Sequence, residues 1–370
     1  MPIPLEQLNK ILMVSISHIG DIVLSCPTAR ALKRFLPHAD IDMLAGMPQA
    51  AAAYHNPYIN KVIPYNIKDW QQDRDKLTAL IQLLRKDKYD LALSSPYGSA
   101  DPMLAWLSGA VYRAGFDTHG SSRYLTHVVP SISPAIRHET ENQLAVLSTL
   151  GITAEDTDIE FVVSASEEGS LSKKLPHLRK KGRPLLLLCP FSDDTQKNWT
   201  ISGYSHVLQA LEKVADCYLI GTRSQRPMLN AINSYAGHVA KVLGGTLSLG
   251  ELGALIKQAD LLITVDTGPM HIAQAFPTPV IALMGPTDPK IWGPRQSCDI
   301  ILNKPMYCSP CWHKDAVKNS CHRNLCMRRI KPAEVIRSAE AILTASKLSN
   351  GLVQKSRAEY PTIRDLDRLK

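Results

Sequence analysis

The sequence lacks the short motifs that mark the commonest nucleotide-binding enzymes. It contains no G-x-x-x-x-G-K-[ST] loop, and no G-x-G-x-x-G follows an apolar strand pattern. A kinase, a P-loop ATPase and an ordinary dehydrogenase are therefore disfavoured. The sequence also has no run of 18 apolar residues, so we expect no transmembrane helix. No secretion signal is expected either, because His18 and Asp21 interrupt the apolar stretch 11–24 and no small-residue cleavage site follows it.

Aromatic side chains are scarce, at 6% of the residues, and no interleaved basic–aromatic surface of the kind that binds nucleic acid is visible. Positive charge is in excess, since 42 Lys and Arg face 34 Asp and Glu and the net charge is +8. This balance favours anionic partners such as nucleotide phosphates, a phosphorylated glycolipid or an acidic membrane surface. The alternative is an even surface excess that serves solubility.

Eight cysteines occur without a secretion signal, which indicates a reducing compartment. In the cytosol such cysteines are thiols or metal ligands and not structural disulfides. We therefore expect a cytoplasmic protein.

Apolar strand patterns alternate with amphipathic helix patterns along the 370 residues, a length that suits two domains. We expect strands at 10–15, 41–44, 90–94, 184–189, 217–221, 261–265 and 280–284, and helices at 21–35, 76–85, 203–213 and 249–258. The alternation predicts an α/β fold of two domains, each with a parallel sheet and helices on both faces. Their expected bounds are 1–165 and 184–331, with a polar linker at 166–183 and a final segment at 332–370.

Three turns between a strand and a helix carry residues suited to chemistry, and ligands of open parallel sheets bind at such turns. The first contains Gly20 and Asp21. Gly20 permits a tight turn into the helix, and Asp21 suits either a helix N-cap or a general base. The second contains Lys197, which is either a solvated surface lysine or a point charge for a phosphate.

The third turn, Val265–Ala273, follows the apolar strand LLITV. Asp266 or Thr267 can cap the next helix, and Pro269 suits its first position. Gly268 lets a ligand approach the backbone, and exposed amides at a helix start attract an anion. His271, one turn further, is either a satisfied core histidine or a donor to the same phosphate.

Three longer stretches then carry a resemblance to a known family. They are HIGDIVLSCPTARALKRFLPHADIDMLAG, DTGPMHIAQAFPTPVIALMGPTDP and CSPCWHKDAVKNSCHRNLCMRRIKPAEV. A G-D-x-x-L turn combined with D-T-G-P-x-H-x-A and G-P-T-D-P is far more specific than any one of them. Over residues 10–345 the chain resembles glycosyltransferase family nine, the lipopolysaccharide heptosyltransferases.

This resemblance implies a GT-B fold, with two facing Rossmann-like domains, the acceptor on the first and the donor on the second. It implies inverting transfer of heptose from ADP-heptose to the lipopolysaccharide inner core, with no cofactor required for catalysis. A last helix at 332–343 would cross back onto the first domain. A lipid-anchored core oligosaccharide as acceptor implies peripheral association with the inner face of the cytoplasmic membrane.

The family's functional residues carry over one position at a time. Asp21 matches the proposed catalytic base, and Lys197 matches a lysine that contacts the donor diphosphate. The residues that match the diphosphate-binding turn are Thr267, Gly268 and His271. Further donor contacts are expected from Ser192, Asp266 and Met270, and acceptor contacts from Arg30, Lys33 and Arg34. A solvated helix face is the alternative for the last three.

One departure from the family lies at 221–226, where an acidic residue often holds the donor ribose. This chain has Gln and Arg there, which leaves the identity of the nucleotide open.

Four cysteines gather near the end of the second domain, in the pattern Cys308-x2-Cys311-x9-Cys321-x4-Cys326. The spacing suits a structural zinc or iron site, with His313 and His322 as spare ligands. The alternative is four reduced thiols in a surface loop.

Two other functions stay open at this point. A zinc-ribbon nucleic-acid-binding protein would use the cysteine segment and its flanking Lys and Arg residues, but the scarcity of aromatic residues disfavours it. A GT-B epimerase, or a transferase of another sugar, would keep the fold and change the chemistry.

Overall fold

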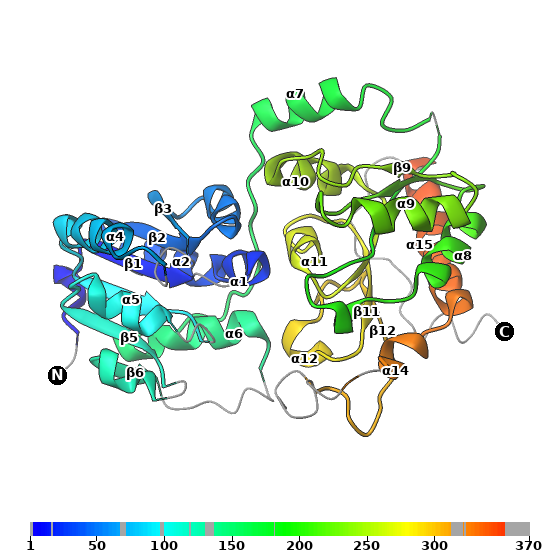
Figure 1. Cartoon of the computed structure of the whole chain (residues 1–370). Coiled ribbons are helices and arrows are strands. Elements are labelled where there is room, and N and C mark those ends of the chain that lie inside the picture. The colour runs from blue at the N-terminus through cyan, green and yellow to red at the C-terminus, as the bar shows by residue number, and fades with distance from the viewer. Residues whose placement is uncertain are drawn as a thin grey trace. The chain divides into compact units, whose positions relative to one another are not determined.

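The computed structural model describes residues 3–15, 18–66, 72–96, 100–117, 120–129, 137–180, 182–311, 321 and 323–351, with side chains up to 345 (Figure 1). The chain divides into two compact units, Met1–Val162 and Val163–Lys370. Each unit has its own six-stranded parallel sheet. The predicted α/β class with two parallel sheets is confirmed.

The first unit contains a sheet with the strand order β3-β2-β1-β4-β5-β6. Its strands are β1 Lys10–Ser15, β2 Asp40–Gly46, β3 Lys61–Tyr65, β4 Leu91–Ser94, β5 Tyr112–Phe116 and β6 His127–Val129. Its α-helices are α1 Ile19–Leu24, α2 Cys26–Phe35, α4 Arg74–Asp87, α5 Asp101–Leu107 and α6 Glu139–Leu144. Short 3-10 helices lie at Leu5–Gln7, Gln49–His55, Ser121–Tyr124 (η3) and Ala145–Leu150.

The second unit repeats this plan, with the order β12-β11-β10-β7-β8-β9. Its strands are β7 Leu185–Cys189, β8 Asp216–Leu219, β9 Lys241–Val242, β10 Leu261–Val265, β11 Val280–Met284 and β12 Ile300–Asn303. Its α-helices are α7 Ala165–Lys174, α8 Ile201–Leu211, α9 Arg226–Tyr235, α10 Leu249–Gln258, α11 Gly268–Ala273, α12 Pro289–Trp292, α14 Leu325–Arg328 and α15 Pro332–Gly351, and a 3-10 helix, η5, spans Thr195–Lys197.

Each sheet has one point where the strand order reverses direction. In the first unit it lies between β1 and β4, and in the second between β7 and β10. These central strands are buried on both faces, as in β7 (LLLLC) and β10 (LLITV), because helices cover both sides of the sheet. Ligands of doubly wound sheets bind where such strands end, so this topology directs attention to the turns after β1, β7 and β10.

The helix predicted at 21–35 is two helices, α1 and α2, which meet at Ser25. Pro27 lies in the first turn of α2, where its missing N–H leaves no intrahelical bond unmade. The hydroxyl of Ser25 donates to the carbonyl oxygen of Ile22 at 2.7 Å and satisfies the end of α1. Pro27 therefore begins a new helix and does not kink a longer one.

The expected linker at 166–183 is part of the second unit. Helix α7 begins with a capping box, in which the Ser164 hydroxyl accepts a bond from the amide of Glu167 and the Glu167 carboxylate accepts one from the amide of Ser164. The pattern S-x-x-E in the sequence predicts the start of this helix. The side chain of Lys174 reaches Glu251 on α10, with Nζ and Oε2 2.7 Å apart.

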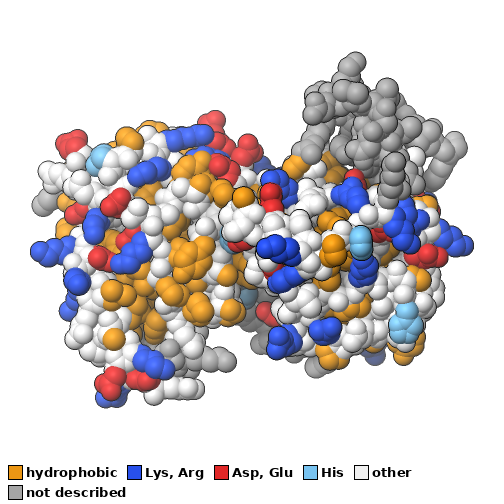
Figure 2. Space-filling view, turned by 90° about the horizontal axis from the view of Figure 1, so that it is seen from above, with side chains coloured by type: hydrophobic (Ala, Val, Ile, Leu, Met, Phe, Trp, Pro, Cys, Tyr) orange, Lys and Arg blue, Asp and Glu red, His pale blue; other side chains and the backbone are white. Residues whose placement is uncertain are grey.

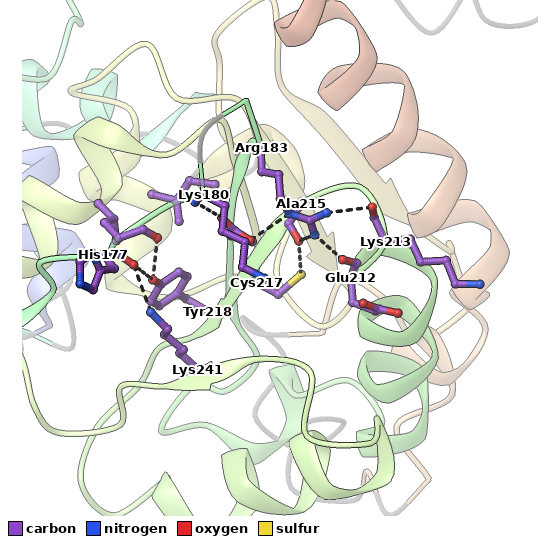
Figure 3. A network of polar contacts seen from close by, with 12 residues as sticks. His177, Lys180, Arg183, Glu212, Lys213, Ala215, Cys217, Tyr218 and Lys241 are labelled. Carbon is purple, nitrogen blue, oxygen red and sulfur yellow. Dashed lines mark hydrogen bonds and ion pairs between the residues drawn. The ribbon is translucent and has the colours of Figure 1, made fainter.

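The end of the expected linker is also fixed to the second sheet (Figure 3). The Arg183 guanidinium donates to the Asp216 carboxylate at 3.0 Å and to the carbonyl oxygens of Lys213, Ala215 and Glu212. The hydroxyl of Tyr218 on β8 donates to the carbonyl of Leu178 at 2.6 Å. A segment so bonded is a structural part of its domain, and the chain divides after Val162 instead.

The first half of α15 packs into the hydrophobic core of the second unit, against α8. Its buried residues are Val335, Ala339, Ile342 and Leu343. Their spacing of three and four residues is that of one helix face. That this helix crosses back onto the first domain stays a prediction. Of the helices within the described residues, none is long and apolar enough to span a membrane.

The contact between α7 and α10 generates a prediction about stability. Glu251 is buried, and its carboxylate accepts bonds from Ser170, Lys174 and the amide of Ser248. Burial alone would raise the pKa of Glu251, but these bonds lower it to about 2. Replacing Glu251 with Gln is expected to cost about 1–3 kcal/mol of unfolding free energy at pH 7.

The pH dependence of this loss identifies its cause. Because the folded pKa of Glu251 is depressed, its contribution is complete above about pH 4.5 and is lost as the pH falls towards about 2. Urea unfolding should show a constant deficit for Glu251→Gln from pH 8 to 5 that shrinks below pH 4. Glu168→Gln, at an exposed pair with Lys257, is the control and should change stability by less than about 1 kcal/mol. A deficit that persists unchanged at pH 2.5 would contradict this account.

Candidate active site

A buried ion pair lies where β7 and β10 end in the second unit. The carboxylate of Asp266 directly follows β10, and its Oδ2 is 2.9 Å from Nζ of Lys197 in the loop after β7. Its Oδ1 is 3.5 Å from Nε2 of His271 on α11. The side chains of Asp266 and His271 are each 5% exposed, and that of Lys197 is 15% exposed. Three of the predicted donor residues therefore form one cluster.

The charges of this cluster depend on one another. Burial would raise the pKa of Asp266, but the Lys197 ammonium and the His271 ring hold that pKa well below its usual range. The carboxylate is therefore ionised at neutral pH, and it requires a cation beside it. Asp266 thus fixes the ammonium of Lys197 at the carboxyl edge of the sheet, with part of its surface exposed.

The predicted diphosphate turn lies beside this cluster. Thr267 is the N-cap of α11 in an extended conformation, and its hydroxyl makes no capping bond. Gly268 and Pro269 form the first turn of the helix. Met270 is completely buried, so its side chain packs beneath the turn and offers no surface for a donor contact. The expected donor contact of Met270 would have to come from its backbone in the first turn of α11, and it stays a prediction.

The loop that carries Lys197 is held by its own side chains. The amide of Ser192 donates to Oδ1 of Asn198 at 2.7 Å, and the hydroxyl of Ser192 accepts a bond from the amide of Asp194 at 3.3 Å. The ring of Trp199 is buried against α8, where only a glycine fits at 203, since a Cβ there would lie 2.6 Å from the ring. Ser192 is therefore a residue of the loop's internal bonding, and its donor contact stays a prediction.

The segment 324–330, which contains Cys326, covers the same loop. Asn324 donates from Nδ2 to the carbonyl of Asn198 at 2.8 Å, and Nε1 of Trp199 donates to the carbonyl of Ile330 at 3.2 Å. Sequence reasoning missed this connection, because residues 324–330 lie more than 120 positions from the lysine loop and no local pattern links them.

The four predicted metal ligands form no disulfide and gather near the end of β11. Cys311 and Cys326 are buried, and Cys308 and Cys321 are half-buried. The Sγ of Cys326 would lie 2.8 Å from a Cβ at Gly285, and the amide of Cys311 donates to the carbonyl of Pro286. Burial and the other three thiols raise the pKa of Cys326 to about 11. Within the described part of the chain, no group of three or more His, Cys, Asp or Glu is arranged to hold a metal ion. The spare ligands His313 and His322 lie outside the described residues.

In the first unit, Asp21 lies at the third position of α1, after β1. Its Oδ2 accepts a bond from the amide of His18 at 3.0 Å, so it closes the start of the helix from within and is not the N-cap itself. Its side chain is 13% exposed, and that of His18 is 75% exposed. The capping role and a role as base are compatible, because a carboxylate can accept several bonds.

The buried polar helix α6 supports this turn, and no pattern in the sequence predicts that contact. Nε2 of Gln143 on α6 donates to the backbone carbonyl of Asp21 at 3.1 Å and to Oε1 of Glu139 at 3.1 Å. Glu139 has no exposed surface, and Nδ2 of Asn142 also donates to it. Only the contact between α1 and α6, more than 100 residues apart in sequence, gives these side chains their position.

The predicted acceptor residues on α2 serve a different purpose. Arg30 is 3% exposed and donates to Glu160 at 2.8 Å and to Asp156 at 2.6 Å, and Arg34 donates to Asp156 at 3.0 Å. Lys33 donates to the carbonyl of Ala39 at 2.8 Å. Two carboxylates therefore pair with both arginines, and Arg30 is buried within these ion pairs. The arginines fasten the end of the first unit to α2. The acceptor contact expected from buried Arg30 is corrected, and those expected from Lys33 and the exposed Arg34 stay predictions.

Comparison with known proteins gives this geometry a family context. The family model of glycosyltransferase family 9 (heptosyltransferase) matches residues 77–322. The chain is 29% identical over 336 residues to lipopolysaccharide heptosyltransferase 3 of Escherichia coli K12, covering 88% of this chain and 95% of that protein.

Solved structures have the same fold. A family 9 glycosyltransferase from Veillonella parvula has a TM-score of 0.80 at 23% identity, covering 91% of this chain and 98% of that one. The ADP-heptose lipopolysaccharide heptosyltransferase II of E. coli has a TM-score of 0.73 at 20% identity, covering 91% and 99%. An iron-containing dodecameric glycosyltransferase of enterotoxigenic E. coli has a TM-score of 0.58 at 15% identity, covering 92% and 77%.

The buried pair of Asp266 and Lys197 predicts a strong dependence of stability on both partners. Asp266→Asn removes one charge and leaves the Lys197 ammonium without its partner, so the unfolding free energy is expected to fall by about 3 kcal/mol. The double variant Asp266→Asn/Lys197→Met should recover part of this loss, because no unpaired charge remains. Urea unfolding of the four proteins of this cycle measures the coupling. A single variant as stable as the wild type would show that the pair is not a constraint on the fold.

Proposed function

Because the chain belongs to glycosyltransferase family 9, the heptosyltransferase family, we propose that it transfers heptose from ADP-heptose to an acceptor of the lipopolysaccharide inner core. The family makes the chain a glycosyl-transferring enzyme with a GT-B fold. The observation that carries the proposal is the lysine held at the carboxyl edge of the second sheet by Asp266, beside the turn Thr267–Gly268. A fixed ammonium at this position suits the diphosphate of a nucleotide sugar.

The donor half of the reaction rests on the second unit. Negative charge grows on the diphosphate as the bond to the anomeric carbon breaks. Lys197 donates to the diphosphate oxygens, and His271 and the Gly268 backbone assist. These groups are already in place where negative charge develops on the diphosphate, so they stabilise it. Asp266 holds Lys197 in place through the ion pair between them.

The acceptor half rests on the first unit. Asp21 takes the proton from the acceptor hydroxyl as the oxygen attacks the anomeric carbon from the face opposite the diphosphate. One bond to the anomeric carbon forms while the other breaks, so the configuration inverts. Gln143 and Glu139 position the backbone of Asp21 and thereby the direction of its carboxylate.

The ribose of the donor is expected near the end of β8, where the family often has an acidic residue. This chain has Gln225 there, and its Oε1 accepts a bond from the amide of Thr222 at 3.0 Å. Hydroxyl groups of Thr222 and Ser224 lie beside it, 2.8 Å from each other. These neutral groups can bond a ribose without a carboxylate, and ADP remains our proposed nucleotide.

Catalysis is proposed to need no metal, since Lys197 supplies the positive charge that a divalent cation provides at other diphosphate sites. Among the residues that the structure describes, no group of three or more His, Cys, Asp or Glu is arranged to hold a metal ion, and a structural metal at the four cysteines stays a prediction. We assign their segment a structural role, in which residues 324–330 support the lysine loop.

The proposed acceptor is a lipid-anchored core oligosaccharide, so the enzyme would work at the inner face of the cytoplasmic membrane as a peripheral protein. Nucleic acid is not a proposed partner. On the face shown in Figure 2, Lys and Arg side chains are scattered among Asp and Glu and form no continuous basic stripe. Such a stripe is the usual footprint of a nucleic-acid site.

The role of Asp21 as base is tested by Asp21→Asn. The amide oxygen can still accept the bond from His18, so the helix start is kept, but it cannot take a proton. Turnover is expected to fall by about 10²–10⁴-fold, while affinity for ADP stays within about threefold. Asp75→Asn, in the first turn of α4 in the same unit, is the matched control and should leave turnover unchanged. Near-wild-type turnover of Asp21→Asn would exclude the base role.

The role of Lys197 is tested by Lys197→Ala and titration with ADP. Loss of a charge-assisted bond, with the Asp266 carboxylate left beside the diphosphate, is expected to weaken binding by about 1.5–3 kcal/mol, or roughly 10–150-fold. Lys257→Ala, at the exposed pair with Glu168, removes the same charge elsewhere in the second unit and should have no effect. Equal ADP affinity for Lys197→Ala and Lys257→Ala would overturn the assignment.

A further inference from the structure

A group of exposed and half-buried aromatic, apolar and cationic side chains lies on the first unit, away from the residues discussed so far. Helix α5 leads through a short turn into β5, and η3 lies beside α5. Trp106 at the end of α5 is 48% exposed, and Val111 before β5 is 62% exposed. Together with Tyr124, Arg85, Arg113 and Arg123 they form what we name the α5–η3 surface.

Ring contacts and hydrogen bonds join these side chains into one group. The rings of Trp106 and Tyr124 are 5.8 Å apart, and the Arg123 guanidinium lies 4.9 Å from the centre of the Tyr124 ring. Arg113 donates from Nε to the carbonyl of Tyr124 at 2.8 Å and from Nη1 to that of Ala110 at 2.7 Å.

Arg85 completes the group from α4. Its Nε donates to the carbonyl of Leu107 at 3.2 Å, and its stem lies against Gly109. The surface therefore combines residues of α4, α5, β5 and η3, which contact one another, and Figure 1 labels the first three of these elements in the first unit.

The three arginines carry charge that no carboxylate of the described chain neutralises by an ion pair. Burial alone lowers the pKa of Arg113, and no acidic neighbour opposes that shift. By contrast, Arg30 and Arg34 form ion pairs with Asp156 and Glu160. The positive charge of the α5–η3 surface is thus available to an external anion.

The α5–η3 surface lies away from Asp21, the proposed catalytic residue of the first unit. Arg85 ends the helix before β4, Val111 and Arg113 lie at the start of β5, and η3 precedes β6. Parallel strands begin at a common edge, so the surface lies at the amino edge of the sheet. Asp21 follows the carboxyl end of β1, at the opposite edge. A substrate site is expected at the carboxyl edge, and a docking surface is free to lie elsewhere.

We propose that the α5–η3 surface docks the enzyme on a bilayer that contains anionic phospholipid. Trp and Tyr prefer the headgroup region, where the ring is buried and its polar edge stays wet, and arginines bind lipid phosphates. An exposed valine adds apolar area between them. The inference rests on the proposed function in that the acceptor is lipid-anchored, and it names the surface that brings the enzyme to that acceptor.

Sedimentation with vesicles of phosphatidylethanolamine and phosphatidylglycerol, against pure phosphatidylcholine, tests the proposal without any turnover. Wild-type protein should bind the anionic vesicles and release as salt rises. Trp106→Ser/Arg123→Gln should weaken this binding about tenfold or more. The control Tyr235→Ser/Lys213→Gln removes an exposed aromatic ring and one charge from the second unit and should stay within about twofold. Trp106→Tyr/Arg123→Lys should restore most of the binding, and circular dichroism checks that each variant is folded.

Kinetics with two acceptors separates docking from catalysis. For Trp106→Ser/Arg123→Gln, KM for a vesicle-borne acceptor should rise about tenfold, while kcat and KM for the deacylated, soluble acceptor stay unchanged.

Four results would overturn the proposal. The first is failure of the wild type to bind anionic vesicles, and the second is binding by Trp106→Ser/Arg123→Gln that equals that of the wild type. The third is a raised KM of this variant for the soluble acceptor, which would make the surface a sugar subsite. The fourth is a change in the molar mass of this variant in light scattering, which would make the surface an interface between copies of the chain. Absence of heptosyl transfer with vesicle binding intact would refute the proposed function alone.

Discussion

The carboxylate of Asp266 is buried at the point where the second sheet reverses its strand order, and an ionised group in that position requires a cation within bonding distance. Lys197 meets this requirement, and the loop after β7 must therefore follow one path. Trp199 packs beneath that loop, Asn198 bonds its start, and residues 324–330 cover it. A structural requirement, the pairing of a buried charge, thus leaves an ammonium group fixed where a diphosphate can bind. The same pair serves stability and the proposed chemistry.

The two units apply one topology to two tasks. In each, a central strand ends at the switch point and a six-residue helix follows, α1 after β1 and α11 after β10. The first turn of α1 holds a carboxylate, suited to removing a proton, and the turn into α11 is flanked by a cation, suited to receiving negative charge. A distant part of the chain supports α1, through the hydrogen bond from Gln143. A buried pair supports α11, through Asp266 and His271. Fold and chemistry are therefore linked by the positions of the strand ends.

Sequence reasoning predicts most of what is local in this protein. The buried strands β10 and β11 and the helix α10 match the predicted bounds, because continuous apolar runs and a capping box at Ser248 and Glu251 define them. The predictions that failed concern residues whose surroundings depend on contacts between distant parts of the chain. From the sequence, Arg30 is predicted to be a solvated or anion-binding cation. In the structure it is paired with Asp156. The segment 166–183 reads as a polar linker until Arg183 and Tyr218 bind it to the second sheet. Likewise, the buried Glu139 and Gln143 have no periodic signature and acquire meaning only through α1.

The central claim is that this chain moves heptose from ADP-heptose to a core acceptor with inversion. Proton NMR of a reaction that contains purified enzyme, ADP-heptose and a deacylated inner-core oligosaccharide measures both the released nucleotide and the configuration of the new linkage. The account predicts one ADP for each heptose transferred and an anomeric configuration opposite to that of the donor, with UDP- and GDP-linked sugars inactive under the same conditions. Transfer with retained configuration, or turnover of a UDP- or GDP-sugar and none of ADP-heptose, would contradict it.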